Sequence, residues 1–193
     1  DDVAHRFRRA RHVVVEPNAA FTVPPRVHRD QPTQTALVVA RLLPLKGVRI
    51  AIEAFADPRL AEWRLEVYGA GYERKHLERQ VARRGIGDRV VFHGHRPRTE
   101  VIDAYDRADV LVFPSLHDQA GWAAAEASAR GVPVVCLPLG GPPLVAERNA
   151  VVAPLTRDLG ESVASAVVEA ARRGGTPHDR WSPDRLPALV ERW

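Results

Sequence analysis

Methionine is absent from the 193 residues, and cysteine occurs once, at Cys136. A single cysteine cannot close an internal disulfide, and it lacks the neighbouring ligands that a cysteine-based metal site needs. One unpaired thiol fits a reducing, cytoplasmic setting. Because the chain begins Asp1-Asp2 without an initiator methionine, we expect it to be a piece of a longer protein.

Long apolar runs are also missing, since Arg, Pro or Gly interrupts each of them. The sequence therefore predicts no membrane-spanning helix. It also lacks the charged, apolar and small-residue order of a signal peptide. Apolar residues nevertheless make up 45% of the chain and charged residues 27%, a balance that predicts a folded globular domain and excludes wholesale disorder.

Lysine is scarce: Lys46 and Lys75 stand against 26 arginines, and the formal net charge is +4. A basic balance can indicate nucleic acid or another anionic partner. The arginine clusters are scattered along the chain, and so strong an arginine bias is typical of a coding preference. We therefore expect no nucleic-acid partner and interpret most arginines as solvated surface.

Two kinds of segment alternate along the chain. The first kind is short, rich in valine and apolar without alternation, which is typical of strands buried on both faces of a parallel sheet. These segments are Val13–Val15, Ala36–Ala40, Leu65–Tyr68, Val90–Phe92, Val110–Phe113, Val134–Leu137 and Val151–Ala153.

The second kind of segment is longer and has helical spacing of apolar residues. Helices are predicted around Val48–Phe55, Glu73–Arg84, Val101–Ala108, Ala123–Ala129, Leu159–Ala171 and Pro183–Trp193. Strand and helix in regular alternation predict an α/β fold with a doubly wound parallel sheet, Rossmann-like. Ligands bind such sheets outside the carboxyl ends of the strands, so candidate sites lie directly after each strand.

Residues 16–35 hold four prolines and little periodicity, which is typical of a linker. We therefore divide the chain in two. Residues 1–34 form an N-terminal segment and interdomain linker with the first strand. Residues 35–193 form the Rossmann-like domain.

The first candidate site is the turn from Arg41 to Gly47, between a strand and a helix. Helix N-termini favour phosphate, and Arg41 and Lys46 add two cations to this one. The alternative is that Arg41 and Lys46 are two solvated cations in a loop and bind no phosphate. A further turn, Gly69-Ala70-Gly71, is weaker, because any tight turn can use Gly-x-Gly.

The most informative segment runs from Pro114 to Glu126. Asp118 precedes a predicted helix that starts near Gly121, and Glu126 lies within it among small apolar residues. Carboxylates here suit the hydroxyls of a ribose or hexose. The alternative is that Asp118 is an N-cap or loop residue and that Glu126 is a solvated helix position. After the next strand, Gly140 and Gly141 could let a ligand approach the backbone. The sequence lacks Gly-x-Ser-x-Gly, His-Glu-x-x-His and Asp-x-Asp.

Taken in order, these motifs resemble the carboxy-terminal lobe of family 4 GT-B glycosyltransferases, which are retaining enzymes. The resemblance covers residues 11–193 and rests on a set of segments in the family's order: Ala40–Gly47, Val67–Gly71, Val91–Pro97, Ala108–Ser115, Asp118 with Glu126, Gly131–Val135 and Gly140-Gly141.

The resemblance implies a lobe that binds the nucleotide-diphosphate sugar donor. Arg41 and Lys46 would hold the diphosphate, and Glu126 the ribose hydroxyls. Asp118 would contact the donor sugar, with Gly69 and the backbone of Ala120, Gly121 and Trp122 alongside. His95 and Arg96 would border the base. Transfer would retain configuration and need no metal and no other cofactor, with Arg41, Lys46 and Asp118 as the catalytic residues.

Two positions depart from the family pattern. Asp118 and Leu144 stand where the family usually has Glu, which bears on the choice of sugar. The resemblance also implies an amino-terminal acceptor-binding domain that is missing here, so the fragment would be weakly active or inactive as a hexosyltransferase. The full protein would be cytoplasmic, with possible peripheral association at the inner membrane face. The alternatives are a nucleotide-sugar epimerase of GT-B shape and a non-catalytic nucleotide-binding module.

Overall fold

The computed structural model describes residues 32–180 and residue 182. Contacts divide the chain into two compact units, residues 23–178 and residues 1–22 with 179–193. Every helix and strand described here lies in the first of these units, which we call the sheet domain. The predicted strand at Val13–Val15, the predicted helix at Pro183–Trp193 and most of the predicted linker lie outside the described residues.

A six-stranded parallel sheet forms the centre of the sheet domain, in the order β3-β2-β1-β4-β5-β6. The predicted doubly wound α/β fold is therefore confirmed. Its strands are β1 (Thr35–Val39), β2 (Arg64–Tyr68), β3 (Val90–Gly94), β4 (Val110–Phe113), β5 (Val134–Cys136) and β6 (Ala150–Val152).

The helices are α2 (Val48–Phe55), α3 (Arg74–Arg84), α4 (Arg98–Arg107), α5 (Trp122–Ala129), α6 (Pro142–Ala146) and α7 (Leu159–Arg173), with 3₁₀ turns η1 (Pro44–Lys46), η2 (Pro58–Leu60) and η3 (Glu147–Asn149). Helix α4 begins three residues before the expected Val101, directly after Pro97, whose fixed φ suits a helix start. Gly85 and Gly174 end α3 and α7 with positive φ.

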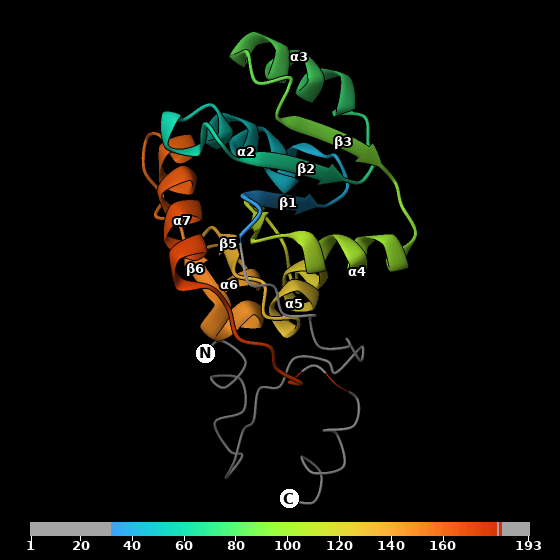
Figure 1. The fold of residues 1–193 in the computed structure, drawn as a ribbon, viewed down its shortest axis with the longest axis vertical. Helices are drawn as coiled ribbons and strands as arrows, with labels where there is room; N and C mark the ends of the chain where they lie inside the picture. Colours follow the sequence, from blue (N-terminus) through green and yellow to red (C-terminus); the bar gives the residue numbers. More distant parts are fainter. Residues whose placement is uncertain (1–31, 181, 183–193) are drawn as a thin grey trace, which may run out of the picture. The chain divides into compact units, whose positions relative to one another are not determined.

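Helices cover both faces of the sheet. Helices α2, α3 and α7 lie on one face, where α2 contacts both of the others, while α4, α5 and α6 lie on the other (Figure 1). Every residue of β4 is buried, because this strand lies between β1 and β5 and under helices on both sides. The edge strand β3 is only partly covered. The apolar core therefore lies along the central strands.

Strand order reverses between β1 and β4. From β1 the chain proceeds through β2 to β3 on one side, and from β4 through β5 to β6 on the other. The loops after β1 and β4 consequently leave the sheet in opposite directions and open a crevice at its carboxyl edge. The predicted phosphate turn and the Pro114–Glu126 segment are these two loops.

Candidate donor-binding site

The loops after β1 and β4 are held against each other by backbone contacts. The Leu116 amide donates to the Leu45 carbonyl at 2.8 Å, and the Ser115 hydroxyl donates to the same oxygen at 3.2 Å. Gly47 allows the close approach, because a Cβ there would lie 2.0 Å from the Pro114 carbonyl oxygen and its φ is +65°. The two candidate segments therefore form one fixed edge.

Lys46 and Asp118 bridge this edge as an ion pair. The ammonium Nζ contacts Asp118 Oδ2, and the two side chains are only 14% and 15% exposed. Asp118 also accepts from the amide of Gly121, the N-cap residue of α5, at 3.0 Å. Asp118 is therefore a loop residue that fixes the entry into α5, and it is not the N-cap. Lys46, which is expected to hold the diphosphate, and Asp118, which is expected to contact the sugar, are thus paired with each other.

Arg41 differs from Lys46 in its surroundings. Its side chain is exposed, and it has no ion pair with any residue that the structure describes. It lines a cleft of about 480 Å³ at the ends of β1 and β2. A guanidinium in this position keeps its donors for an oxyanion.

The same cleft gathers five of the predicted site residues: Arg41, Gly69, His95, Arg96 and Glu126. They come from the loops after β1, β2 and β3 and from α5. Lys46 and Asp118 are not among the lining residues, and Ala120, Gly121 and Trp122 form the entry into α5. Five of the ten predicted site residues therefore line one cleft, and the other five are not among its lining residues.

Gly69 shapes the floor of this cleft. Its φ is +138°, and a Cβ there would lie 1.8 Å from the Ala40 carbonyl oxygen. The Ala40 amide in turn donates to the Tyr68 carbonyl at 3.0 Å. The loops after β1 and β2 can pack this closely only around a residue without a side chain.

Glu126 has the partner that an acid set among small apolar residues needs. Its side chain is 16% exposed and accepts from Arg98 Nε at 2.9 Å. Arg98 is the first residue of α4 and lines the same cleft. Arg96 was predicted as a site residue, but Arg98, two residues further on, was not. Arg98 also follows the end of β3, where ligands of such sheets bind.

Buried Tyr105 lies beneath Glu126. Burial raises the pKa of the Tyr105 hydroxyl well above its ordinary value, and the negative charge of Glu126 raises it further. The hydroxyl donates to the Ala123 carbonyl at 3.4 Å. The neutral phenol therefore supports the first turn of α5 from below, while Glu126 remains on the cleft side.

Gly140 and Gly141 have a different role from the expected one. A Cβ at Gly140 would lie 2.2 Å from the Asp118 carbonyl oxygen, and one at Gly141 would lie 1.9 Å from that of Gln119. The Gly141 amide donates to the Asp118 carbonyl at 3.0 Å. The backbone that approaches these glycines is thus the loop after β4, and they position Asp118.

Among the described residues, no three His, Cys, Asp or Glu side chains lie close enough to hold a metal ion. Over the same residues, no helix has the length and apolar character to cross a membrane.

Fold and cleft together define a Rossmann-like α/β domain of the GT-B glycosyltransferase type. The family model for glycosyl transferases group 1 matches residues 23–159, well over half of the chain. The chain therefore belongs to this family of glycosyltransferases.

Two sequence relatives illustrate the family. The chain is 37% identical over 105 residues to the 2-deoxystreptamine glucosyltransferase of Streptomyces kanamyceticus, covering 53% of this chain and 27% of the relative. It is 32% identical over 167 residues to a D-inositol 3-phosphate glycosyltransferase of Segniliparus rotundus, covering 83% and 32%. The chain thus spans about a third or less of the curated relatives it matches.

Solved structures agree on the fold. The pneumococcal O-GlcNAc transferase GtfA in complex with UDP and GlcNAc superposes with a TM-score of 0.67 at 18% identity, over 88% of this chain and 33% of that one. Anabaena HepE in complex with UDP and glucose has a TM-score of 0.61 at 25% identity, over 70% and 38%.

Proposed function

We propose that this chain is the donor-binding lobe of a retaining, metal-independent glycosyltransferase and binds a nucleotide-diphosphate sugar. The observation that carries the proposal is the shared cleft: Arg41 and Glu126, far apart in sequence, line one cavity at the carboxyl edge of the sheet. Family membership supports the reaction class, and the UDP complexes of two structural relatives support the class of donor.

In this proposal Arg41 binds the diphosphate, because it is the arginine of the cleft lining that has no ion pair with a described residue, while Arg96 pairs with Glu100 and Arg98 with Glu126. Lys46 assists it: an ammonium has three donors, and the pair with Asp118 uses one of them. As the sugar departs, negative charge grows on the diphosphate, and prepositioned cations stabilise that charge. Asp118 is held by Lys46 and the Gly121 amide where it would meet the sugar.

Glu126 takes the ribose hydroxyls. A carboxylate has about four acceptor positions, so it can accept from a diol while one oxygen remains bonded to Arg98. Arg98 fixes the orientation of the carboxylate. Gly69 leaves the floor open, and His95 and Arg96 border the base. Ala120, Gly121 and Trp122 lie along the sugar and phosphate.

The acceptor would bind to an amino-terminal domain elsewhere in the whole protein, since the chain spans about a third of its relatives. Hexosyl transfer by this chain alone would then be weak or absent. We also propose a cytoplasmic enzyme, with the full protein peripherally associated with the inner membrane face.

Calorimetry with UDP and its 2′,3′-dideoxy analogue tests the assignment of Glu126. The native chain should bind UDP more tightly, because a site built to accept from hydroxyls loses affinity when they are missing. Glu126→Gln should shrink that difference. Equal binding of the two nucleotides by the native chain would show that Glu126 is a structural acid and would overturn the donor placement.

A further inference from the structure

A second cavity of the sheet domain, about 610 Å³, lies over α2 between α3 and the start of α7. None of its lining residues lines the donor cleft. Its volume falls within the range of ligand sites, roughly 300–1,000 Å³. We call it the basic groove; five arginines and a histidine line it against two acids: Arg49, His76, Arg79, Arg83, Arg84, Arg157, Glu53 and Asp158.

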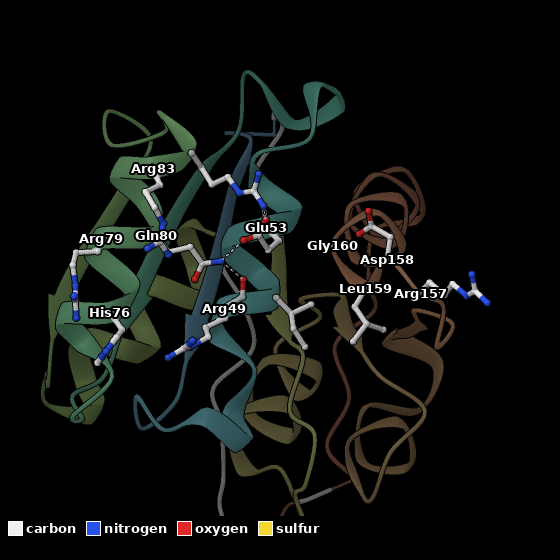
Figure 2. A pocket seen from close by; sticks show the side chains of 12 residues that line it. Arg49, Glu53, His76, Arg79, Gln80, Arg83, Arg157, Asp158, Leu159 and Gly160 are labelled. Atoms are coloured by element: carbon white, nitrogen blue, oxygen red, sulfur yellow. Dashed lines mark hydrogen bonds and ion pairs between the residues drawn. The ribbon is translucent and has the colours of Figure 1, made fainter.

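Helix α3 supplies most of this charge from one face. His76, Arg79 and Arg83 recur at i, i+3 and i+7, with Gln80 between them, and Figure 2 shows these side chains together along α3. Arg79 and Arg83 are four residues apart, a spacing at which like charges on a helix repel each other. The residues of α3 that line the groove include no acid to offset them.

The acids of the groove are already engaged. Glu53 on α2 pairs with Arg84 and accepts from Gln80 Nε2 at 2.5 Å. Asp158 caps α7 by accepting from the Glu161 amide at 2.9 Å. His76, Arg79 and Arg83 have no ion pair with another described residue, and Arg79 donates only to the Lys75 carbonyl of its own helix.

The floor of the groove is rigid. Gln80 is 7% exposed and also donates to the Arg49 carbonyl at 3.0 Å, which ties α3 to α2. Gly160 brings α7 against α2, since a Cβ there would lie 2.9 Å from Glu53 Cβ. Figure 2 shows Glu53 and Gln80 joined at the centre of the groove. Arg49 pairs with Glu73 and Arg84 with Glu53, so the positive potential over this fixed concave floor comes from Arg79 and Arg83, which have no ion pair with a described residue.

We propose that the basic groove is a second anion site, which binds a phosphate-bearing ligand through Arg79 and Arg83. Guanidinium forks match phosphate oxygens in geometry and charge. The ligand chemistry is a phosphate group, supplied either by a soluble phosphate ester or by the headgroup of an anionic phospholipid. The site is separate from the donor cleft and goes beyond the proposed glycosyl transfer.

The test uses the full chain carrying Arg41→Ala, so that the donor cleft contributes little. Inorganic pyrophosphate is titrated by calorimetry, and vesicles of phosphatidylglycerol and phosphatidylcholine in equal parts are sedimented with the protein. Replacing both Arg79 and Arg83 by Ala should weaken the binding of at least one probe by about tenfold or more, as two charge-assisted contacts are lost. The double Gln variant, which keeps side-chain bulk, should behave alike.

Lys75→Ala is the matched control, because it removes one positive charge from the same helix outside the groove lining. It should change binding by about twofold or less. If the double variant loses pyrophosphate binding, the ligand is a soluble phosphate ester. If it loses vesicle binding, the ligand is the headgroup of an anionic phospholipid. The proposal is overturned if neither probe binds, if Lys75→Ala weakens binding as much as the double variant, or if only a short RNA oligonucleotide binds through these arginines.

Discussion

The proposed donor-binding edge of the sheet and the basic groove differ in how most of their charges are held. At the carboxyl edge, Lys46 is paired with Asp118 and Arg98 with Glu126, and the acids are largely buried. In the groove, Arg79 and Arg83 are exposed and unpaired among the described residues. Pairing fixes the direction of a side chain, whereas free cations adapt to a ligand. The carboxyl edge is therefore organised to bind a ligand in one defined geometry. The groove is organised to bind a ligand mainly by its negative charge.

Backbone packing at the cleft should give the largest effect, because the loops after β1 and β2 meet closely around Gly69. Gly69→Ala places a Cβ on the Ala40 carbonyl oxygen at a strained φ. We expect the free energy of unfolding to fall by about 3 kcal/mol or more, measured by urea denaturation. Gly87→Ala is the control, since no atom lies within 4 Å of its Cβ. Similar losses in both variants would contradict the close packing described.

Binding at the cleft should show the next effect. Arg41→Ala should weaken UDP binding by about 1.5–3 kcal/mol through loss of a charge-assisted contact, and leave uridine binding nearly unchanged. Calorimetry with both ligands measures the difference. Arg79→Ala removes an equal charge from the basic groove and should leave both affinities close to native. Equal losses for UDP and uridine would remove Arg41 from the diphosphate site.

Removing a paired cation at the carboxyl edge should lower the free energy of unfolding more than removing an unpaired cation from the groove. Lys46→Ala leaves Asp118 poorly exposed and without its cation, and should lower the free energy of unfolding by about 1–2 kcal/mol. Arg83→Ala should change it by less than about 0.5 kcal/mol. Chemical denaturation of the single variants and of Lys46→Ala with Asp118→Asn measures the coupling. If Lys46→Ala is as mild as Arg83→Ala, the pair does not hold the edge.

The smallest effect belongs to an ion pair outside both cavities. Arg59 lowers the pKa of Asp57 to about 2 from an ordinary value of 3.8. Because the folded pKa is the lower one, the pair contributes stability above about pH 4, and this contribution is lost as the pH falls toward 2. Asp57→Asn should flatten that part of the stability curve, measured by thermal unfolding across this range. An unchanged slope would contradict the assignment.

Much of the fold was predictable because strands buried on both faces are continuous apolar runs. Val110–Phe113 was predicted with its observed bounds for this reason. The start of α4 was missed, because its first turn from Arg98 to Glu100 carries no apolar residue and periodicity gives no signal there. Arg98 went unnoticed as a site residue for the same reason. Its importance comes from Glu126, 28 positions away.

The sequence by itself determined the parallel α/β fold, the family and the placement of the candidate residues after strand ends, because periodicity and turn chemistry are local. Only the tertiary structure decided which charges meet. It paired Lys46 with Asp118 and Arg98 with Glu126, left Arg41 open to the cleft, and used Gly140 and Gly141 to position a loop. It also formed the basic groove, since helices distant in sequence face one another only after the sheet has brought them together.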